Sequence, residues 1–288
     1  MSKVYGIITN KIIKLLEEGV VPWRKPWNSI GLAVNWVTQK PYRGINTMLL
    51  NPGEYATKKQ IKNAGGKIKE KEKGHMIVFW TWLDVNDDEE SNADLDSETT
   101  KKIPYIRYYK VYEINTQCEG LLSKRKEKEV YDHNPIEEAE AIIKGYKNAP
   151  TIKFGHNRAS YCPLFDLIRI PSMCDFKSVE EFYSTLFHEC LHSTGRRTRL
   201  NRSGVIGKII YGSEIYSREE LIAELGAAML CGVCGIDNST IKNSASYISS
   251  WLRKLEDDPK LIIQAAAQAQ KGVDLILNFQ PEKYTEKE

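Results

Sequence analysis

The sequence predicts an α+β protein in two parts. In the first part, residues 76–83 and 105–114 are rich in β-branched and aromatic residues, which favours an antiparallel pair of strands. In the second part, apolar residues recur at helical spacing ahead of His188, and short strand-like pieces precede that helix. Both parts therefore combine helices with strands, as expected for the α+β class.

A boundary between the two parts is expected near residue 130. The charged stretch 124–129 runs into the dipeptide Asn134-Pro135, a combination that is typical of a linker. We therefore predict one domain over residues 1–130 and a second over residues 135–288.

The first domain is predicted to begin with a helix over about residues 3–18, which carries charges on both edges. Two prolines exclude a helix from the following segment, 19–27. A short strand is expected at 33–37, and helices are expected at 43–50 and 57–64.

An acidic insertion separates the two long strands. Residues 84–98 contain eight Asp or Glu and no Lys or Arg. Such a segment cannot bury enough apolar surface to fold by itself, so we expect a mobile, solvated insertion over about residues 84–102.

The second domain is predicted to open with a helix and a small sheet. Amphipathic segments are expected to close the chain, after the two helices that carry the motifs described next. The helix is expected at 136–147, the strands at 151–154, 159–162 and 167–170, and the closing segments at 240–255 and 260–279.

The run His188-Glu189-Cys190-Leu191-His192 has the HExxH spacing. On a helix, His188 and His192 lie one turn apart on the same face and can bind one metal ion. Glu189 then lies beside the ion, where it can accept a proton from a bound water. We therefore predict His188 and His192 as metal ligands and Glu189 as the general base.

The surrounding sequence supports a helix over this motif. Ser178 followed by Glu181 is typical of a capping box, and an apolar stripe runs from residue 179 to residue 187. Gly195 is a natural stop signal. A small sheet beside a helix with HExxH is the zincin arrangement.

A third ligand must come from elsewhere, because catalytic zinc takes three protein ligands and a water. No histidine follows His192, so a carboxylate is expected, with a cysteine as the alternative. Ser217 and Glu220 form a second capping-box pattern, and Glu220 and Glu224 share a helical face. We predict Glu220 as the ligand and Glu224 as a hydrogen-bond partner of a ligating histidine. The reverse assignment and Glu219 remain open.

This ligand set predicts a zinc metallopeptidase. Zinc lowers the pKa of its bound water to about 7, and Glu189 would accept the proton as hydroxide attacks a carbonyl group. Tyr211 and Tyr216 are candidate donors to the oxyanion. One Zn²⁺ per chain is expected, although Mn²⁺ or Co²⁺ can occupy similar ligands.

The first 82 residues carry an excess of nine positive charges, and aromatic side chains lie among them. Cations that follow phosphates and rings that stack on bases suit single-stranded nucleic acid. The predicted DNA-binding residues are Trp23, Arg24, Lys25, Trp27, Trp36, Lys40, Tyr42, Arg43, Asn46, Lys58 and Lys59.

A cytoplasmic location is predicted for the protein. The chain contains no apolar run of transmembrane length and no secretory signal pattern. Its six cysteines are irregularly spaced, which does not suggest a disulfide framework. No membrane partner is expected.

Several strings in the chain resemble the ArdC-type antirestriction proteins of mobile genetic elements. The resemblance rests on Val21-Pro22-Trp23-Arg24-Lys25-Pro26-Trp27 and Tyr42-Arg43-Gly44-Ile45-Asn46 in the first domain, and on residues 188–195, 199–202 and 216–227 in the second. It implies an N-terminal single-stranded-DNA-binding domain, a C-terminal zincin-like metallopeptidase domain, and protection of incoming DNA from restriction.

Two other hypotheses follow from the same residues. In one, the metal site is structural and the protein protects DNA by covering it. In the other, DNA recruits a protease to proteins bound or crosslinked to DNA. Glu189 counts against the first, because a structural site needs no general base.

Overall fold

The computed structural model describes residues 3–18, 20–23, 32–85, 101–125, 135–207, 213–236 and 245–280. Helices and strands occur in both halves of the chain, which confirms the α+β prediction. Most of the predicted acidic insertion, residues 86–100, lies outside the described residues. Among the described helices, none is long and apolar enough to cross a membrane.

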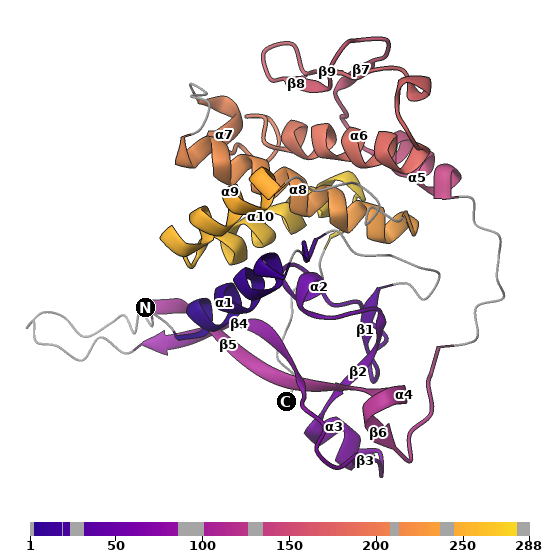
Figure 1. The fold of residues 1–288 in the computed structure, drawn as a ribbon, viewed down its shortest axis with the longest axis vertical. Helices are drawn as coiled ribbons and strands as arrows, with labels where there is room; N and C mark the ends of the chain where they lie inside the picture. The colour runs from indigo at the N-terminus through magenta and orange to yellow at the C-terminus, as the bar shows by residue number, and fades with distance from the viewer. Residues whose placement is uncertain are drawn as a thin grey trace, which may run out of the picture.

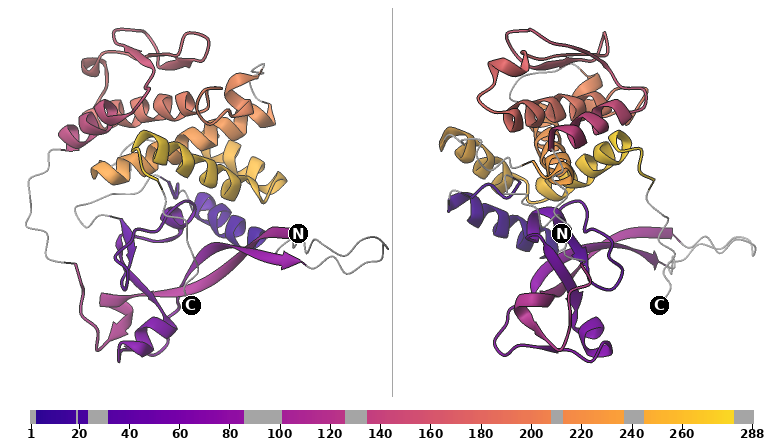
Figure 2. Two further views of the ribbon diagram at one scale, coloured as in Figure 1. Left: turned by 180° about the vertical axis from the view of Figure 1, so that it is seen from behind. Right: turned by 90° about the vertical axis from the view of Figure 1, so that its right-hand side faces the viewer.

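The first half is built on a four-stranded sheet, whose longest strands form a twisted ribbon (Figure 2). The sheet order is β1-β2-β5-β4, with β1 parallel to β2 and the other pairs antiparallel. The predicted strand pair is confirmed, and it extends from His75↔Val111 to Val85↔Lys101. The elements are α1 (Lys3–Glu17), β1 (Ala33–Asn35), α2 (Asn46–Leu49), β2 (Gly53–Thr57), α3 (Lys58–Asn63), β3 (Lys67–Ile68), β4 (His75–Val85), β5 (Lys101–Glu113), α4 (Ile114–Gln117) and β6 (Cys118–Glu119).

The second half places a small sheet over a stack of helices (Figure 1). The sheet order is β7-β9-β8, so β8 is an edge strand among the described residues. Strand β9 pairs parallel to β7 and antiparallel to β8. The elements are α5 (Pro135–Gly145), β7 (Thr151–Lys153), β8 (Ser160–Cys162), β9 (Leu167–Arg169), a 3₁₀ turn (Met173–Asp175), α6 (Val179–Thr194), α7 (Ser203–Ile206), α8 (Glu214–Cys234), α9 (Ala245–Asp257) and α10 (Leu261–Ile276).

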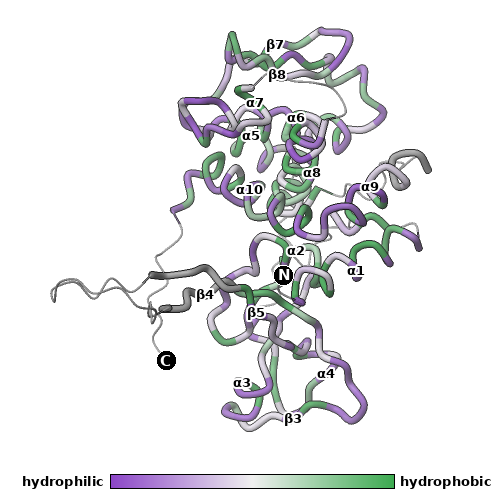
Figure 3. The backbone as a smooth tube through the Cα atoms, turned by 90° about the vertical axis from the view of Figure 1, so that its left-hand side faces the viewer, coloured by the Kyte–Doolittle hydropathy of each residue, from purple (hydrophilic) through white to green (hydrophobic). Residues whose placement is uncertain are grey.

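The two halves share one apolar core. Helix α8 is hydrophobic along most of its length (Figure 3) and belongs to a buried cluster that also contains residues of α1, β4 and β5. Trp23 meets Trp251 of α9 edge to face, with ring centroids 6.3 Å apart. Thr9 Oγ1 donates to the backbone carbonyl of Pro259 at 2.6 Å. The predicted boundary near residue 130 therefore separates parts of the chain that pack against each other.

Helix α6 begins and ends where the sequence predicts. The Ser178 side chain accepts a hydrogen bond from the Glu181 N–H, while the Glu181 carboxylate accepts from the N–H of Lys177. The helix ends at Gly195, whose φ of −76° any residue can adopt. Glycine is required there for space, because a Cβ would lie 2.4 Å from Cγ2 of Val205.

Helix α8 begins one turn earlier than predicted. The capping side chain is Ser213, which accepts from the Tyr216 N–H at 3.2 Å, and Ser217 lies inside the helix. The glutamates Glu219 and Glu220 consequently occupy the second turn. The helix dipole acts mainly on the first turn, so it does not explain why these two acids are there.

Candidate metal centre

Three side chains from two helices converge on one point. His188 and His192 lie one turn apart on α6, and their Nε2 atoms are 3.1 Å apart. Glu220 of α8 reaches both rings, with Oε2 3.5 Å from His188 Nε2 and Oε1 3.6 Å from His192 Nε2. One ligand atom from each residue lies within 4.8 Å of the others, a spacing that fits a single divalent ion. The fold thus brings together the three predicted ligands.

The remaining nitrogen of His192 faces a second carboxylate. His192 Nδ1 lies 3.3 Å from Glu219 Oε1. The guanidinium of Arg202 binds Glu219 through two hydrogen bonds, of 2.7 and 2.9 Å. Burial would raise the pKa of Glu219, but these hydrogen bonds bring it below its ordinary value. An ionised Glu219 can therefore fix the tautomer and the orientation of the His192 ring.

Glu189 lies next to the three converging side chains and is 7% exposed. Burial raises the pKa of its carboxyl group, and the charges of His188 and His192 oppose the rise. The backbone N–H of Tyr161 donates to the carboxylate and holds it at the edge of the site. A buried, oriented carboxylate in this place can accept a proton from a water bound in the cavity beside the histidines.

Acidic groups surround His188. Burial disfavours its charged form, but the hydrogen bond to Glu220 and the charges of Glu224 and Glu189 raise its pKa to about 9. Glu224 thus acts on His188 through its charge. A hydrogen bond to a ligating histidine was predicted for Glu224. In the structure Glu219 makes such a contact, with His192. The role of Glu224 stays a prediction.

A cavity of about 320 Å³ opens over the converging side chains. Tyr216 lines it and hydrogen-bonds to Glu220, so its hydroxyl lies near the reacting groups. Tyr211, the other predicted oxyanion donor, lies outside the described residues. The lining residues are Arg158, Ala159, Ser160, Tyr161, Pro163, His188, Glu189, His192, Gly204, Val205, Tyr216, Glu219 and Glu220.

A cluster around Asp166 fixes the β8–β9 hairpin above this cavity. Asp166 accepts hydrogen bonds of 2.8 Å from both Nη atoms of Arg199 and one of 2.9 Å from the Tyr161 hydroxyl. Arg199 also donates to the backbone carbonyl of Ser193 in α6 at 2.9 Å. The strand that borders the cavity is therefore tied to the end of the helix that carries the histidines.

Sequence reasoning missed Arg202 and Arg199. Both belong to the run 196–202, which contains four arginines and is typical of an exposed basic loop. The sequence does contain one indication of a buried arginine, because two adjacent glutamates inside an apolar helix need a cation if they are buried. That rule does not say which arginine supplies the cation.

Both halves of the chain match known protein families. Residues 137–268 match the zincin-like metallopeptidase family, and residues 2–112 match the N-terminal domain of the anti-restriction factor ArdC. The metal-free crystal structure of the antirestriction protein ArdC from plasmid R388 is similar to this chain. The matched stretch covers 96% of this chain and 99% of the ArdC chain. Its identity to this chain is 32%, with a TM-score of 0.72. The chain belongs to the ArdC antirestriction family.

Further relatives have the same two-domain stretch. The Mn(II)-bound structure of R388 ArdC is 32% identical over 95% of this chain, with a TM-score of 0.71. Two DNA primases TraC of Escherichia coli are 31% and 30% identical over 97% and 98% of the chain. The chain spans only 27% and 20% of their length. The uncharacterized protein y4eC of Sinorhizobium fredii is 29% identical and is covered over 91% of its length.

In this ArdC-family chain, three predicted DNA-binding residues belong to the core. Trp23 is 0% and Trp36 is 8% exposed, and Trp36 Nε1 donates to the Leu122 carbonyl at 2.9 Å. The Asn46 amide exchanges two hydrogen bonds, of 2.8 and 2.9 Å, with the backbone of Val78. These predictions are wrong for this structure, because an enclosed side chain can neither stack on a base nor reach a phosphate.

Arg43 of the first domain contacts residues of the second domain. Its guanidinium forms an ion pair with Asp274 of α10 and lies 4.6 Å from the ring centroid of Phe279. The N–H of the neighbouring Gly44 donates to the Gln270 side chain at 2.8 Å. Arg43 therefore joins the two domains, and its predicted contact with DNA stays a prediction.

The other predicted DNA contacts remain predictions. The lysines Lys40, Lys58 and Lys59 are exposed, and Tyr42 is half-buried. The residues Arg24, Lys25 and Trp27 lie outside the described residues.

The β4–β5 ribbon exposes rings that the sequence analysis did not single out. Phe79, Tyr108 and Tyr109 are 47%, 49% and 46% exposed. Arg107 and Lys110, which flank the tyrosines on β5, are also exposed. The ArdC-type first domain thus presents exposed rings beside cations, on a strand pair rather than in the tryptophan-rich segment.

Proposed function

We propose that this chain is a single-stranded-DNA-binding antirestriction protein with a metal-dependent, peptidase-like site. The observation that carries the proposal is the convergence of His188, His192 and Glu220 beside the buried carboxylate of Glu189. Family membership supports the antirestriction role. The presence of the same two-domain stretch inside DNA primases supports an action on DNA.

The metal proposed is zinc, held by His188, His192 and Glu220. Two imidazoles and one carboxylate with room for a water are a common donor set of catalytic zinc. The same ligands can accept manganese, and the relative from plasmid R388 was crystallised with Mn(II). The ion would supply an activated water and would polarise a carbonyl oxygen.

The chain's own residues then have separate tasks. Glu189 accepts the proton of the water and can pass it on to the leaving amine. Glu219, held by Arg202, binds Nδ1 of His192 and so leaves Nε2, which lies beside His188 and Glu220, as the nitrogen that would hold the ion. The hydroxyl of Tyr216 lines the cavity and can donate to the oxyanion of a tetrahedral intermediate.

Single-stranded DNA is proposed to lie along the first domain. The exposed rings Phe79, Tyr108 and Tyr109 offer stacking surfaces, and exposed cations accompany them on the ribbon. Each base stacked on an aromatic side chain contributes about 1–3 kcal/mol. Tyr109→Ala should therefore weaken binding of a labelled single strand about fivefold or more. Phe165→Ala, which removes an exposed ring in the second domain, should not.

The function is tested by transferring an unmodified plasmid into a restricting host and an isogenic non-restricting host. Cells that make the wild-type chain should recover more transformants than control cells, and only in the restricting host. Glu189→Gln should abolish the protection, whereas Glu180→Gln, an exposed glutamate on the same helix, should retain it. No protection by the wild-type chain would refute the antirestriction role.

The same experiment separates catalysis from simple coverage of DNA. Full protection by the Glu189→Gln variant, with its metal still bound, would favour a binding protein whose metal site is structural. DNA-stimulated cleavage of a DNA-bound protein by the wild type would instead favour the protease hypothesis.

A further inference from the structure

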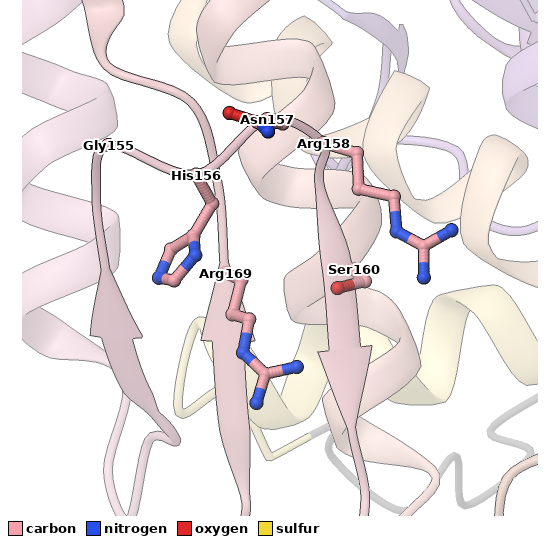
Figure 4. Close-up of a pocket in the computed structure, with 6 residues that line it drawn as sticks. All are labelled: Gly155, His156, Asn157, Arg158, Ser160 and Arg169. Carbon is pink, nitrogen blue, oxygen red and sulfur yellow. The ribbon is translucent and has the colours of Figure 1, made fainter.

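A second cavity lies on the outer face of the three-stranded sheet, next to the metal cavity. It has a volume of about 300 Å³ and is lined by Gly155, His156, Asn157, Arg158, Ser160 and Arg169. Figure 4 shows the His156 ring and the Arg169 guanidinium beside the same space, with the Ser160 side chain directed toward it and Arg158 extending past the edge of β8. The cavity is therefore lined by cations and polar groups.

The positive charges of this cavity lack counter-ions among the described residues. No described carboxylate lies within ion-pair distance of Arg158 or Arg169, and no described group accepts a hydrogen bond from either guanidinium. Lys153 and Arg169 are direct cross-strand partners in the β7–β9 pair. Like charges on neighbouring strands repel each other. An anionic ligand would relieve this repulsion.

Arg158 and Ser160 line both cavities, so the cationic cavity continues directly into the metal cavity. Between them runs β8, whose partner among the described residues is β9 alone. The N–H of Tyr161 in β8 donates to Glu189, which places the free edge of the strand against the metal site. An extended peptide can add to such an edge, with main-chain hydrogen bonds.

The alternation of side chains along a strand determines which cavity each residue of an added peptide would face. Ile168, the partner of Tyr161, is fully buried, so this register position faces α6 and the metal site. Ser160 and its partner Arg169 face the opposite side. Side chains of the added peptide alternate in the same way. A residue beside the one facing the metal therefore enters the cationic cavity.

We propose that this cavity selects an Asp or Glu side chain of a peptide that pairs with the free edge of β8. Arg158 and Arg169 would bind the carboxylate with charge-assisted hydrogen bonds, the geometry for which a guanidinium is best suited. The proposal rests on the proposed function, because it requires the metal cavity to receive a peptide. The strand edge and the shared walls favour a peptide over nucleic acid.

The test measures peptide binding to zinc-loaded Glu189→Gln protein, which binds without cleaving. Two pools of fluorescent heptapeptides carry Glu or Gln at the central position and mixed neutral residues elsewhere. The Glu pool should bind about tenfold more tightly. Arg169→Gln, which leaves the walls of the metal cavity intact, should lower the affinity for the Glu pool severalfold, toward that for the Gln pool, and leave the affinity for the Gln pool unchanged. Arg197→Gln, an exposed arginine outside the cavity, is the matched control.

Each other outcome overturns the proposal in a distinguishable way. Equal binding of the two pools would remove the acidic subsite and leave the peptide site standing. If neither pool binds, the metal cavity does not receive peptides and the proposed function fails as well. If the arginine variant loses affinity for a single-stranded oligonucleotide while the preference for Glu is unchanged, the cavity belongs to the DNA path. Unchanged thermal unfolding of the variant would show that its fold is intact.

Discussion

Replacing Arg202 by Met tests how the fold supports the metal centre. The Arg202 guanidinium makes two hydrogen bonds to Glu219 and further ones, of 2.7 Å each, to Thr194 Oγ1 and the Leu191 carbonyl. The side chains of Arg202 and Glu219 are 6% and 5% exposed. Arg202→Met would therefore leave Glu219 as a buried charge without a cation.

The expected loss is large. Removing one partner of a buried ion pair costs about 3–5 kcal/mol of unfolding free energy. For domains of this size that corresponds to a fall in Tm of roughly 6 to 20 °C. The double variant Arg202→Met/Glu219→Leu should regain most of the loss, because neither charge then remains buried.

Stability and metal affinity should respond differently in this cycle. Unfolding in urea is measured with EDTA present, so that bound metal does not contribute. Metal affinity is measured separately, by competition with a chromogenic chelator. The double variant should recover stability but keep a metal affinity about 10- to 100-fold below wild type, because His192 has lost its carboxylate partner. A loss of less than 1 kcal/mol in Arg202→Met, or a double variant no more stable than the single one, would refute the reasoning.

Three further predictions concern the surroundings of the site. Gly195→Ala should lower the free energy of unfolding by about 1–3 kcal/mol, because its Cβ would overlap Val205. Adding Val205→Ala should cost less than the sum of the two single changes, because it removes the closest contact, and urea unfolding measures all three variants. The pKa of Asp166 lies below its ordinary 3.8, since hydrogen bonds from Arg199 outweigh the effect of burial. The stability lost in Asp166→Asn should therefore be complete above about pH 4 and vanish as the pH falls lower, and a gap that stays constant down to pH 2 would contradict this. Zinc at about 100 times its Kd should add about 2.7 kcal/mol to unfolding in a calorimeter, and EDTA should remove the increment.

The sequence was most informative where local patterns control the structure. The Ser178 cap and the stop at Gly195 placed α6 correctly, because capping hydrogen bonds and helix ends depend on neighbouring residues. The antiparallel ribbon was found for the same reason, from a dense run of aromatic and β-branched residues. The number of residues between HExxH and Glu220 does not indicate how far apart they lie in the fold. The preference of zinc for a carboxylate as third ligand nevertheless selected Glu220, which the fold brings to both histidines.

The errors arose where two distant segments meet. Trp23 lies in a basic, aromatic string, but its ring is covered by Trp251, more than two hundred residues away in sequence. In the same way, the sequence does not show that Arg43 pairs with Asp274 in the last described helix. A single sequence shows which residues suit DNA, but burial by a second domain depends on tertiary packing that composition does not encode.

The start of α8 shows a smaller error of the same kind. Both Ser213 and Ser217 precede acidic residues and could cap a helix. The fold uses Ser213, and the chain continues helically through Ser217. As a result Glu219 is buried against Arg202, a contact that propensity at the helix terminus could not indicate.

The most direct test of the metal centre is the metal content of the purified protein, measured by mass spectrometry after dialysis against limiting zinc. Wild type and Glu224→Ala should each retain about one divalent ion per chain, and Glu220→Ala should retain almost none. Glu224→Ala is the matched control, since it removes a carboxylate one turn further along the same helix. Loss of the ion in Glu224→Ala but not in Glu220→Ala, or no bound ion in any of the three proteins, would contradict the ligand set on which the proposed chemistry depends.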